Sequence, residues 1–406
     1  MSLRILFSSV GGRGRIFLGA IAMTALIIGA GCSSSPPVPS SFYSVPAGSA
    51  LRGKPGDILR TEPVAGVLGG ASAVRILYVS SGVHGNPILV SGVVIFPTAA
   101  PTNGPRGVVA WAHATTGVAE SCAPSLLPHV FATIPGLSEL LTRGYVVTAT
   151  DYPGLGTVGP HPYLVGLSEG RAVLDSVRAA GRLPGTKTGS RFAVWGHSQG
   201  GHAVLFAGEL ARNYAPELSL VGIAAAAPAT DLATLLKDDI DSPVGRVLAA
   251  YTLSSWSKIY GARIDPFIAP VARPAFDRAV ADCVENIGEA YRVSVDIRPL
   301  RTGFPVRDVS TVAPWPGRLT RNTPGQARAG APLFISQGTI DPIVRPDVTA
   351  QFVMVQRRRG ETVRFVKLDR VGHMTAGKVS APAAVAWIDD RFADRPAPND
   401  DVIQPK

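Results

Sequence analysis

Short β-rich runs alternate with helical patterns along most of the chain, and this alternation constrains the fold more than any other feature. The candidate buried strands lack strict apolar–polar alternation, which is typical of strands covered on both faces; they lie at 107–112, 145–150, 191–195, 219–226, 332–336 and 363–367. An antiparallel pair at 74–80 and 88–96 precedes them. Helical patterns fall between the strands at about 134–143, 167–181, 199–213, 346–359 and 380–393. The order predicts an α/β fold with a mostly parallel sheet and helices on both faces.

One long segment breaks this rhythm. Residues 229–325 show no clear strand and carry aromatic and proline-rich pieces. Long structureless excursions are rare inside a compact domain, so we predict a mainly helical insertion there. The remaining core would comprise residues 51–228 and 326–397, followed by a flexible tail at 398–406.

The composition excludes two broad classes of protein. Hydrophobic residues make up 46% and charged residues 17% of the 406 residues, which excludes disorder as the main state. The net charge of +10 is scattered, without the basic stripe and interleaved aromatics of a nucleic-acid-binding face. We therefore expect no nucleic-acid partner.

The N-terminus has the layout of an export signal. Residues 1–15 are basic, residues 16–31 are apolar and small, and Cys32 follows. The apolar stretch is short for a bilayer span. Gly29-Ala30-Gly31-Cys32 resembles a bacterial lipobox, in which Cys32 would carry lipid, and the Ser/Pro-rich residues 32–50 read as a tether. We expect an exported chain held to a lipid surface through Cys32, with plain secretion and an uncleaved anchor as the alternatives.

Two further cysteines remain, Cys122 and Cys283. In an exported chain an even remainder favours a disulfide. The alternative is a pair of buried free thiols.

Gly196-His197-Ser198-Gln199-Gly200 stands between a strand pattern and a helical pattern. A strand–turn–helix holds such a serine on a strained backbone that needs small neighbours, and the helix N-terminus directs free N–H groups at a developing anion. We predict that Ser198 is a nucleophile. A second G-x-S-x-G copy at 166–170 follows a proline-rich stretch that cannot be a central strand; Ser168 is therefore predicted to cap a helix.

A serine nucleophile needs a base, and the base needs a carboxylate. Where this turn occurs, the chain order is Ser, acid, His. His373 is the only histidine far enough beyond Ser198 to leave room for an acid, and it is predicted to lie in a loop. Asp341, in the loop after the strand pattern 332–336, is the predicted acid, with Asp231 and Asp369 as competitors.

Two backbone N–H groups should bind the oxyanion. One is expected from Gln199 and the other from Thr115 or Thr116 in the loop after 107–112, although that loop also reads as a plain turn. The chain carries no HExxH, paired CxxC or P-loop sequence. We expect no metal and no organic cofactor.

Together these residues resemble the secretory lipase family of the α/β-hydrolase superfamily, the Candida lipase A type with its bacterial relatives. The resemblance covers about 70–390 and rests on the sequences DYPGLG at 151–156, GHSQGG at 196–201, QGTID at 337–341 and GH at 372–373. It implies an α/β-hydrolase core, a helical lid or cap over an acyl-binding tunnel, and Ser-His-Asp hydrolysis of carboxylic esters, triacylglycerols included. It also implies Thr116 as the second oxyanion donor and a Cys122–Cys283 disulfide.

Other functions are compatible with the same residues. The fold could transfer acyl groups to alcohols or cleave peptides, or a surface lipoprotein could bind acyl ligands without turnover. The expectation that follows from the sequence is a monomer that acts on acyl esters.

Overall fold

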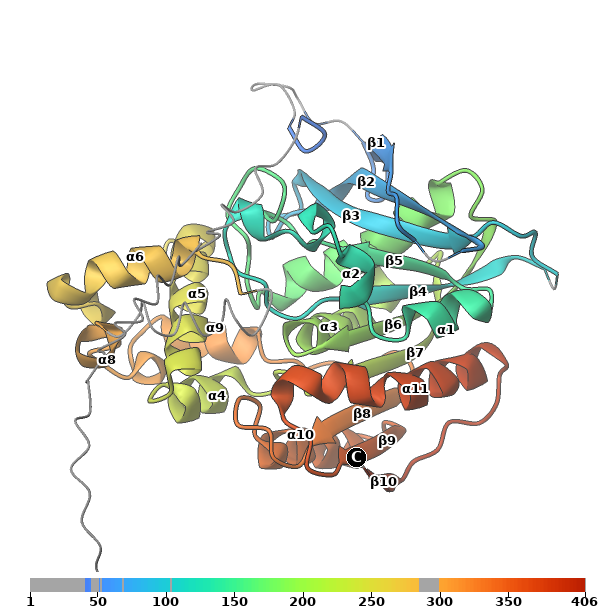
Figure 1. Ribbon diagram of the computed structural model, residues 1–406. Coiled ribbons are helices and arrows are strands. Elements are labelled where there is room, and N and C mark those ends of the chain that lie inside the picture. The colour runs from blue at the N-terminus through green and yellow to red at the C-terminus, as the bar shows by residue number, and fades with distance from the viewer. Residues whose placement is uncertain are drawn as a thin grey trace, which may run out of the picture. The chain divides into compact units, whose positions relative to one another are not determined.

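A ten-stranded sheet forms the centre of the computed structural model, which describes residues 41–44, 51, 53–67, 69–102, 104–284 and 299–405. Its strand order is β1-β2-β3-β5-β4-β6-β7-β8-β9-β10 (Figure 1). The strands are β1 (Ile58–Pro63), β2 (Ala71–Ser81), β3 (Pro87–Pro97), β4 (Arg106–Ala112), β5 (Val146–Thr150), β6 (Thr188–His197), β7 (Ser219–Ala226), β8 (Leu333–Gly338), β9 (Val363–Leu368) and β10 (Asp401–Gln404). All pairs from β5 to β10 are parallel, and β1, β2 and β3 extend one side with antiparallel pairing. The predicted mostly parallel sheet is thus confirmed.

Helices cover both faces of this sheet, as the sequence predicts (Figure 1). The α-helices are α1 (Leu137–Thr142), α2 (Gly166–Arg182), α3 (Gln199–Tyr214), α4 (Leu232–Asp239), α5 (Pro243–Tyr260), α6 (Arg273–Ala281), α8 (Leu300–Gly303), α9 (Trp315–Arg321), α10 (Pro346–Arg358) and α11 (His373–Phe392). Single 3₁₀ turns cover Glu120–Cys122, Pro124–Leu126, Val130–Thr133, Asp265–Phe267, Pro270–Ala272 and Val309–Thr311.

Strand β6 shows why the apolar runs are continuous. Phe192 and Val194 belong to the apolar cluster that β6 shares with α2 and α3 on one face, whereas Ala193 and Trp195 belong to the cluster that it shares with α11 on the other. All four side chains are fully buried. Because successive side chains of a strand point to opposite faces, a strand covered on both sides has no polar positions.

The segment between β7 and β8 builds a second apolar cluster. Its described residues form α4, α5, α6, α8 and α9 and contain no strand. Trp256 of α5 stacks on Trp315 of α9 with ring centroids 5.9 Å apart, and Phe267 packs edge-on against Trp315. Aromatic packing of this kind holds the helices of the insertion together. The cluster also includes residues outside the insertion, such as Val118 and Val344.

A disulfide joins Cys122, in the loop after β4, to Cys283, just beyond α6, with the two Cα atoms 5.3 Å apart. The expected pairing is confirmed. Next to it, the backbone N–H of Val284 donates to the carbonyl of Thr116 at 2.8 Å. The loop after β4 and the helical insertion are therefore joined by a covalent bond and a hydrogen bond.

The chain ends differ from the predictions. The predicted flexible tail contains β10, whose residues Asp401–Gln404 pair in parallel with β9. Asp401 also pairs with Arg357 at 2.7 Å, so a short charged segment is fixed by contacts that its own pattern does not reveal. Of the predicted tether, the structure describes residues 41–44, where Tyr43 is buried and bonds to Ser125 at 2.8 Å. The signal segment 1–31 and Cys32 lie outside the described residues.

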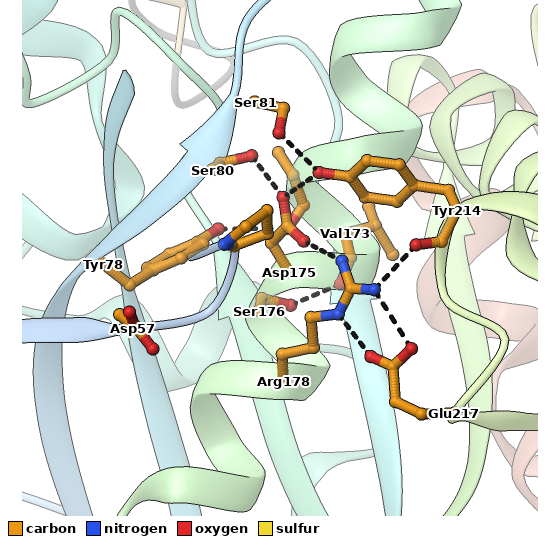
Figure 2. A network of polar contacts seen from close by, with 12 residues as sticks. Asp57, Tyr78, Ser80, Ser81, Val173, Asp175, Ser176, Arg178, Tyr214 and Glu217 are labelled. Carbon is orange, nitrogen blue, oxygen red and sulfur yellow. Dashed lines mark hydrogen bonds and ion pairs between the residues drawn. The ribbon is translucent and has the colours of Figure 1, made fainter. Parts of the chain in front are cut away.

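A buried carboxylate ties α2 to its neighbours (Figure 2). Asp175 accepts hydrogen bonds from Ser80 of β2 at 2.7 Å and from the hydroxyl of Tyr214 at 2.8 Å, and it pairs with Arg178 at 2.7 Å. Arg178 continues to Glu217 at 2.6 Å. Burial raises the pKa of Asp175, against the effect of these hydrogen bonds. The network fixes the helix that carries Glu169, a residue that matters below.

Candidate active site

Ser198 occupies a sharp turn between β6 and α3. Its backbone has φ 58° and ψ −116°, a region that non-glycine residues rarely adopt. A Cβ at Gly196 would lie 2.2 Å from the carbonyl oxygen of Gly200, and one at Gly200 would lie 1.9 Å from that of Ala112. The turn can therefore form only with glycine at both positions.

The fold brings Ser198, His373 and Asp341 together from three separate segments. Nε2 of His373 lies 2.8 Å from Oγ of Ser198, and Nδ1 lies 2.8 Å from Oδ2 of Asp341. With a proton on Nδ1, the imidazole donates to the carboxylate and accepts from the hydroxyl. This arrangement suits removal of the serine proton. His373 is the first residue of α11 rather than a loop residue, because the helix begins seven residues earlier than predicted.

Asp341 is held as a carboxylate. Its Oδ1 accepts from the backbone N–H groups of Ile343 and Val344, both at 2.9 Å, and Gln337 donates to Oδ2 at 3.0 Å. Burial alone would raise the pKa of Asp341, but the hydrogen bond and charge of His373 and the two N–H groups outweigh it, so this pKa lies below its ordinary value. The two competing acids lie elsewhere: Asp231 accepts from Thr234 at the start of α4, and Asp369 lies near Arg370.

His197 holds the backbone of His373 in place through a hydrogen bond. Its Nε2 donates to the backbone carbonyl of His373 at 3.0 Å, and the two rings lie 5.1 Å apart. Burial, then repulsion by His373, lowers the pKa of His197 to about 3, so its ring is neutral. Sequence reasoning missed this role, because the bond joins residues 176 positions apart.

The two residues expected to donate backbone N–H groups to the oxyanion have different surroundings. Gln199 is the first residue of α3, where a backbone N–H has no partner within the helix. Thr116 uses its carbonyl to bind Val284, and its hydroxyl is buried with no partner among the described residues. The neighbouring Thr115 bonds through its hydroxyl to Tyr163 at 2.9 Å.

A buried pair behind Gln199 was also missed. Glu169 of α2 and His202 of α3 are fully buried, with Oε2 and Nδ1 2.9 Å apart. The second nitrogen of His202 donates to the carbonyl of Asn322 at 2.8 Å, so one proton is shared across the Glu169–His202 contact. The other carboxylate oxygen of Glu169 accepts from the Gln199 side chain at 2.7 Å and from the N–H of Leu164 at 2.9 Å.

The prediction for the second G-x-S-x-G copy was wrong in one respect. Ser168 is not a helix cap: α2 begins at Gly166, its N-cap is Val165, and the hydroxyl of Ser168 is buried without a partner among the described residues. The first turn contains Glu169, as the acidic position near a helix start predicts. Its side-chain partners, however, are Gln199 and His202 of α3, and it also accepts from the backbone N–H of Leu164.

An apolar pocket opens beside Ser198. Helices α4 and α5 of the insertion contribute most of its wall, together with the segment just before α2 and the loop after Asp341. The pocket is lined by Tyr163, Leu164, Ser198, Gln199, Ala229, Leu232, Leu235, Leu236, Asp239, Gly245, Leu248, Ala249, Thr252, Leu319, Ile343 and Val344. Apolar walls with few polar groups are typical of sites for small apolar ligands.

Within the described ranges, no group of three or more His, Cys, Asp or Glu side chains is placed to hold a metal ion. None of the helices described there has both the length and the hydrophobicity needed to span a bilayer.

Comparison with known structures defines the class of the fold. The chain is similar to Candida antarctica lipase A in its closed state, with a TM-score of 0.74 and 21% identity, covering 91% of this chain and 90% of that one. It is also similar to the rice cell wall degrading esterase LipA from Xanthomonas oryzae in a ligand-bound form, with a TM-score of 0.67 and 19% identity, covering 85% of this chain and 100% of that one. The fold is that of the α/β-hydrolases.

Sequence comparison then identifies the family. The sequence model of the secretory lipases matches residues 132–400. Lipase 10 of Candida albicans is 27% identical over 397 residues, covering 90% of this chain and 83% of the relative. A Mycobacterium tuberculosis protein named a probable inactive lipase is 25% identical over 386 residues, covering 89% of this chain and 83% of the relative. The chain belongs to the secretory lipase family and is a carboxylic ester hydrolase.

Proposed function

We propose that the chain is an exported serine hydrolase that cleaves carboxylic esters of apolar acyl groups through an acyl-enzyme. Ser198 attacks the ester carbonyl while His373 takes its proton, and Asp341 stabilises the imidazolium. His373 then gives the proton to the leaving alcohol and later activates water. The observation that carries the proposal is the hydrogen-bond chain from Ser198 through His373 to Asp341, with both contacts at 2.8 Å.

The backbone N–H groups of Gln199 and Thr116 are the proposed oxyanion donors. Gln199 is supported by its place at the helix start, where the positive end of the dipole favours an anion. Thr116 is supported by its place in the loop after β4, which the disulfide and the Val284 hydrogen bond hold in position.

The substrate class is supported by the pocket. Its wall is largely aliphatic, so burial of an acyl chain against it is favourable by about 0.8 kcal/mol for each methylene. Triacylglycerols and shorter esters share this acyl chemistry. Export is supported by the Cys122–Cys283 disulfide, since such bonds persist in oxidising compartments.

The test is Ser198→Ala on a panel of nitrophenyl esters of increasing acyl length. We expect hydrolysis to fall by about 10³-fold or more while the thermal unfolding curve stays nearly unchanged. A fluorophosphonate probe should label the wild-type chain at Ser198 and leave the variant unlabelled. Wild-type turnover by the variant, or an unlabelled wild-type chain, would refute the assignment.

A further inference from the structure

One acidic side chain lines the otherwise largely apolar pocket. Asp239, the last residue of α4, belongs to the same pocket wall as Ser198. The surrounding wall includes Leu235 and Leu236 from its own helix and Leu248 from α5. An apolar group that fills the pocket would therefore lie beside Asp239.

Close packing fixes the place of Asp239. The start of α5 approaches the end of α4 at Gly245, where a Cβ would lie 1.9 Å from the backbone oxygen and 2.6 Å from the Cβ of Asp239. Only glycine permits this approach. The backbone that carries the carboxyl is therefore held against the neighbouring helix.

The carboxyl of Asp239 has no hydrogen-bond or ion-pair partner within the described ranges, although it is half-buried. The adjacent Asp238 takes the nearby cation instead, with Arg345 at 2.8 Å. The charged groups that act on Asp239 are Asp238 on its own helix and Asp341 and Arg345 from the segment after β8. The pocket-facing residues of α5 and α9 carry no charge.

We propose that Asp239 is a specificity-determining residue, which admits long apolar acyl chains when its carboxyl is neutral and opposes them when it is ionised. The inference rests on the proposed function, since it takes the pocket as the acyl site. A chain laid against a carboxylate removes water from an unpaired charge, which is costly, whereas a protonated acid carries a much smaller penalty. A short acyl group leaves that water in place.

The change between the neutral and the ionised carboxyl of Asp239 falls within the physiological pH range. Burial, followed by repulsion from Asp238 and Asp341, raises the pKa of Asp239 to about 7, with Arg345 opposing the shift. The preference for long chains over short ones should therefore fall as the pH rises through about 7.

The experiment measures kcat/KM for nitrophenyl dodecanoate and nitrophenyl acetate across this pH range and takes their ratio. Both substrates use the same Ser198, His373 and Asp341, so any effect of pH that the two reactions share cancels in the ratio. For the wild-type chain we expect the ratio to fall on the order of tenfold from the acidic to the basic side. Asp239→Asn should give a ratio that stays high at every pH.

Asp238→Asn is the matched control, because it removes the same charge one residue away from the pocket lining. The Asp238→Asn variant should show the full fall in the dodecanoate-to-acetate ratio. The midpoint of that fall should lie at lower pH, because the charge of Asp238 no longer repels the ionised carboxyl of Asp239. A flat wild-type ratio overturns the inference even if Asp239→Asn fails to fold, and so does a folded Asp239→Asn variant that keeps the slope. If the wild-type chain hydrolyses neither ester, the proposed function fails together with the inference; a flat ratio with good hydrolysis rejects the role of Asp239 alone.

Discussion

Replacement of Glu169 by alanine should be among the most destabilising single changes in this chain. The carboxylate is fully buried between α2 and α3. It meets three groups: the ring of His202 at 2.9 Å, the side chain of Gln199 at 2.7 Å and the N–H of Leu164 at 2.9 Å. Alanine would remove the partner of the His202 ring, of the Leu164 N–H and of one N–H of the Gln199 amide, whose other contact, to His161 at 3.1 Å, would remain. Water does not reach this site.

The magnitude follows from the burial of the pair. Breaking a buried ion pair by removing one partner costs about 3–5 kcal/mol, because the remaining group loses its compensation. Glu169→Gln is the isosteric control. Its amide oxygen can still accept from Gln199 and Leu164, and its NH₂ can donate to Nδ1 of a neutral His202, which keeps its bond to Asn322 through Nε2. We expect this variant to lose no more than about 1.5 kcal/mol.

The assay is equilibrium urea unfolding at pH 7, followed by circular dichroism. The free energy of unfolding of Glu169→Ala should lie about 3–5 kcal/mol below that of the wild-type chain, with Glu169→Gln close to the wild type. A loss below about 1 kcal/mol for alanine, or equal losses for the two variants, would show that the pair contributes little beyond its packing.

Two further predictions concern stability. The Cys122→Ser/Cys283→Ser double variant should lose up to about 5 kcal/mol in urea unfolding, because the disulfide closes a loop of 161 residues in the unfolded chain; an unchanged midpoint would contradict this. His197 has a pKa of about 3 when folded and an ordinary value of 6.5, so the unfolded chain binds a proton that the folded chain does not, and stability falls as the pH drops through this window. His197→Gln should therefore show a shallower loss of unfolding free energy between pH 7 and pH 4.5, and an equal slope would exclude this titration as the cause.

Local features of the sequence predicted the sheet and the serine turn. The central strands β4, β6, β7 and β8 carry continuous apolar runs, each long enough to identify without knowledge of its neighbours. His373 and Asp341 were predicted from the chain order that this chemistry requires, and the structure brings both within hydrogen-bond distance of their expected partners. The start of α11 was misplaced, because Gly377 and Pro382 inside the helix obscure its period.

The supporting contacts could not be predicted from the sequence. His197 meets the backbone of His373, and Glu169 meets His202, across long sequence separations. Each of these residues has an ordinary local explanation as a turn neighbour or a helix-start acid. Only the packing of the helices against the sheet decides which buried polar groups meet, since each must find a partner when water is excluded.

The two G-x-S-x-G copies illustrate this difference. At Gly200 the added Cβ would strike a backbone oxygen of β4, so glycine there serves the turn itself. At Gly166 it would lie 2.2 Å from the ring of Phe206, and at Gly170 it would lie 3.0 Å from the backbone nitrogen of Ala207, both on α3. Glycine in the second copy therefore lets α2 lie close against α3. That close approach carries the intervening Glu169 to the side chain of Gln199, the residue after the proposed nucleophile. The second motif, although it supplies no nucleophile, thus positions a group that supports the first.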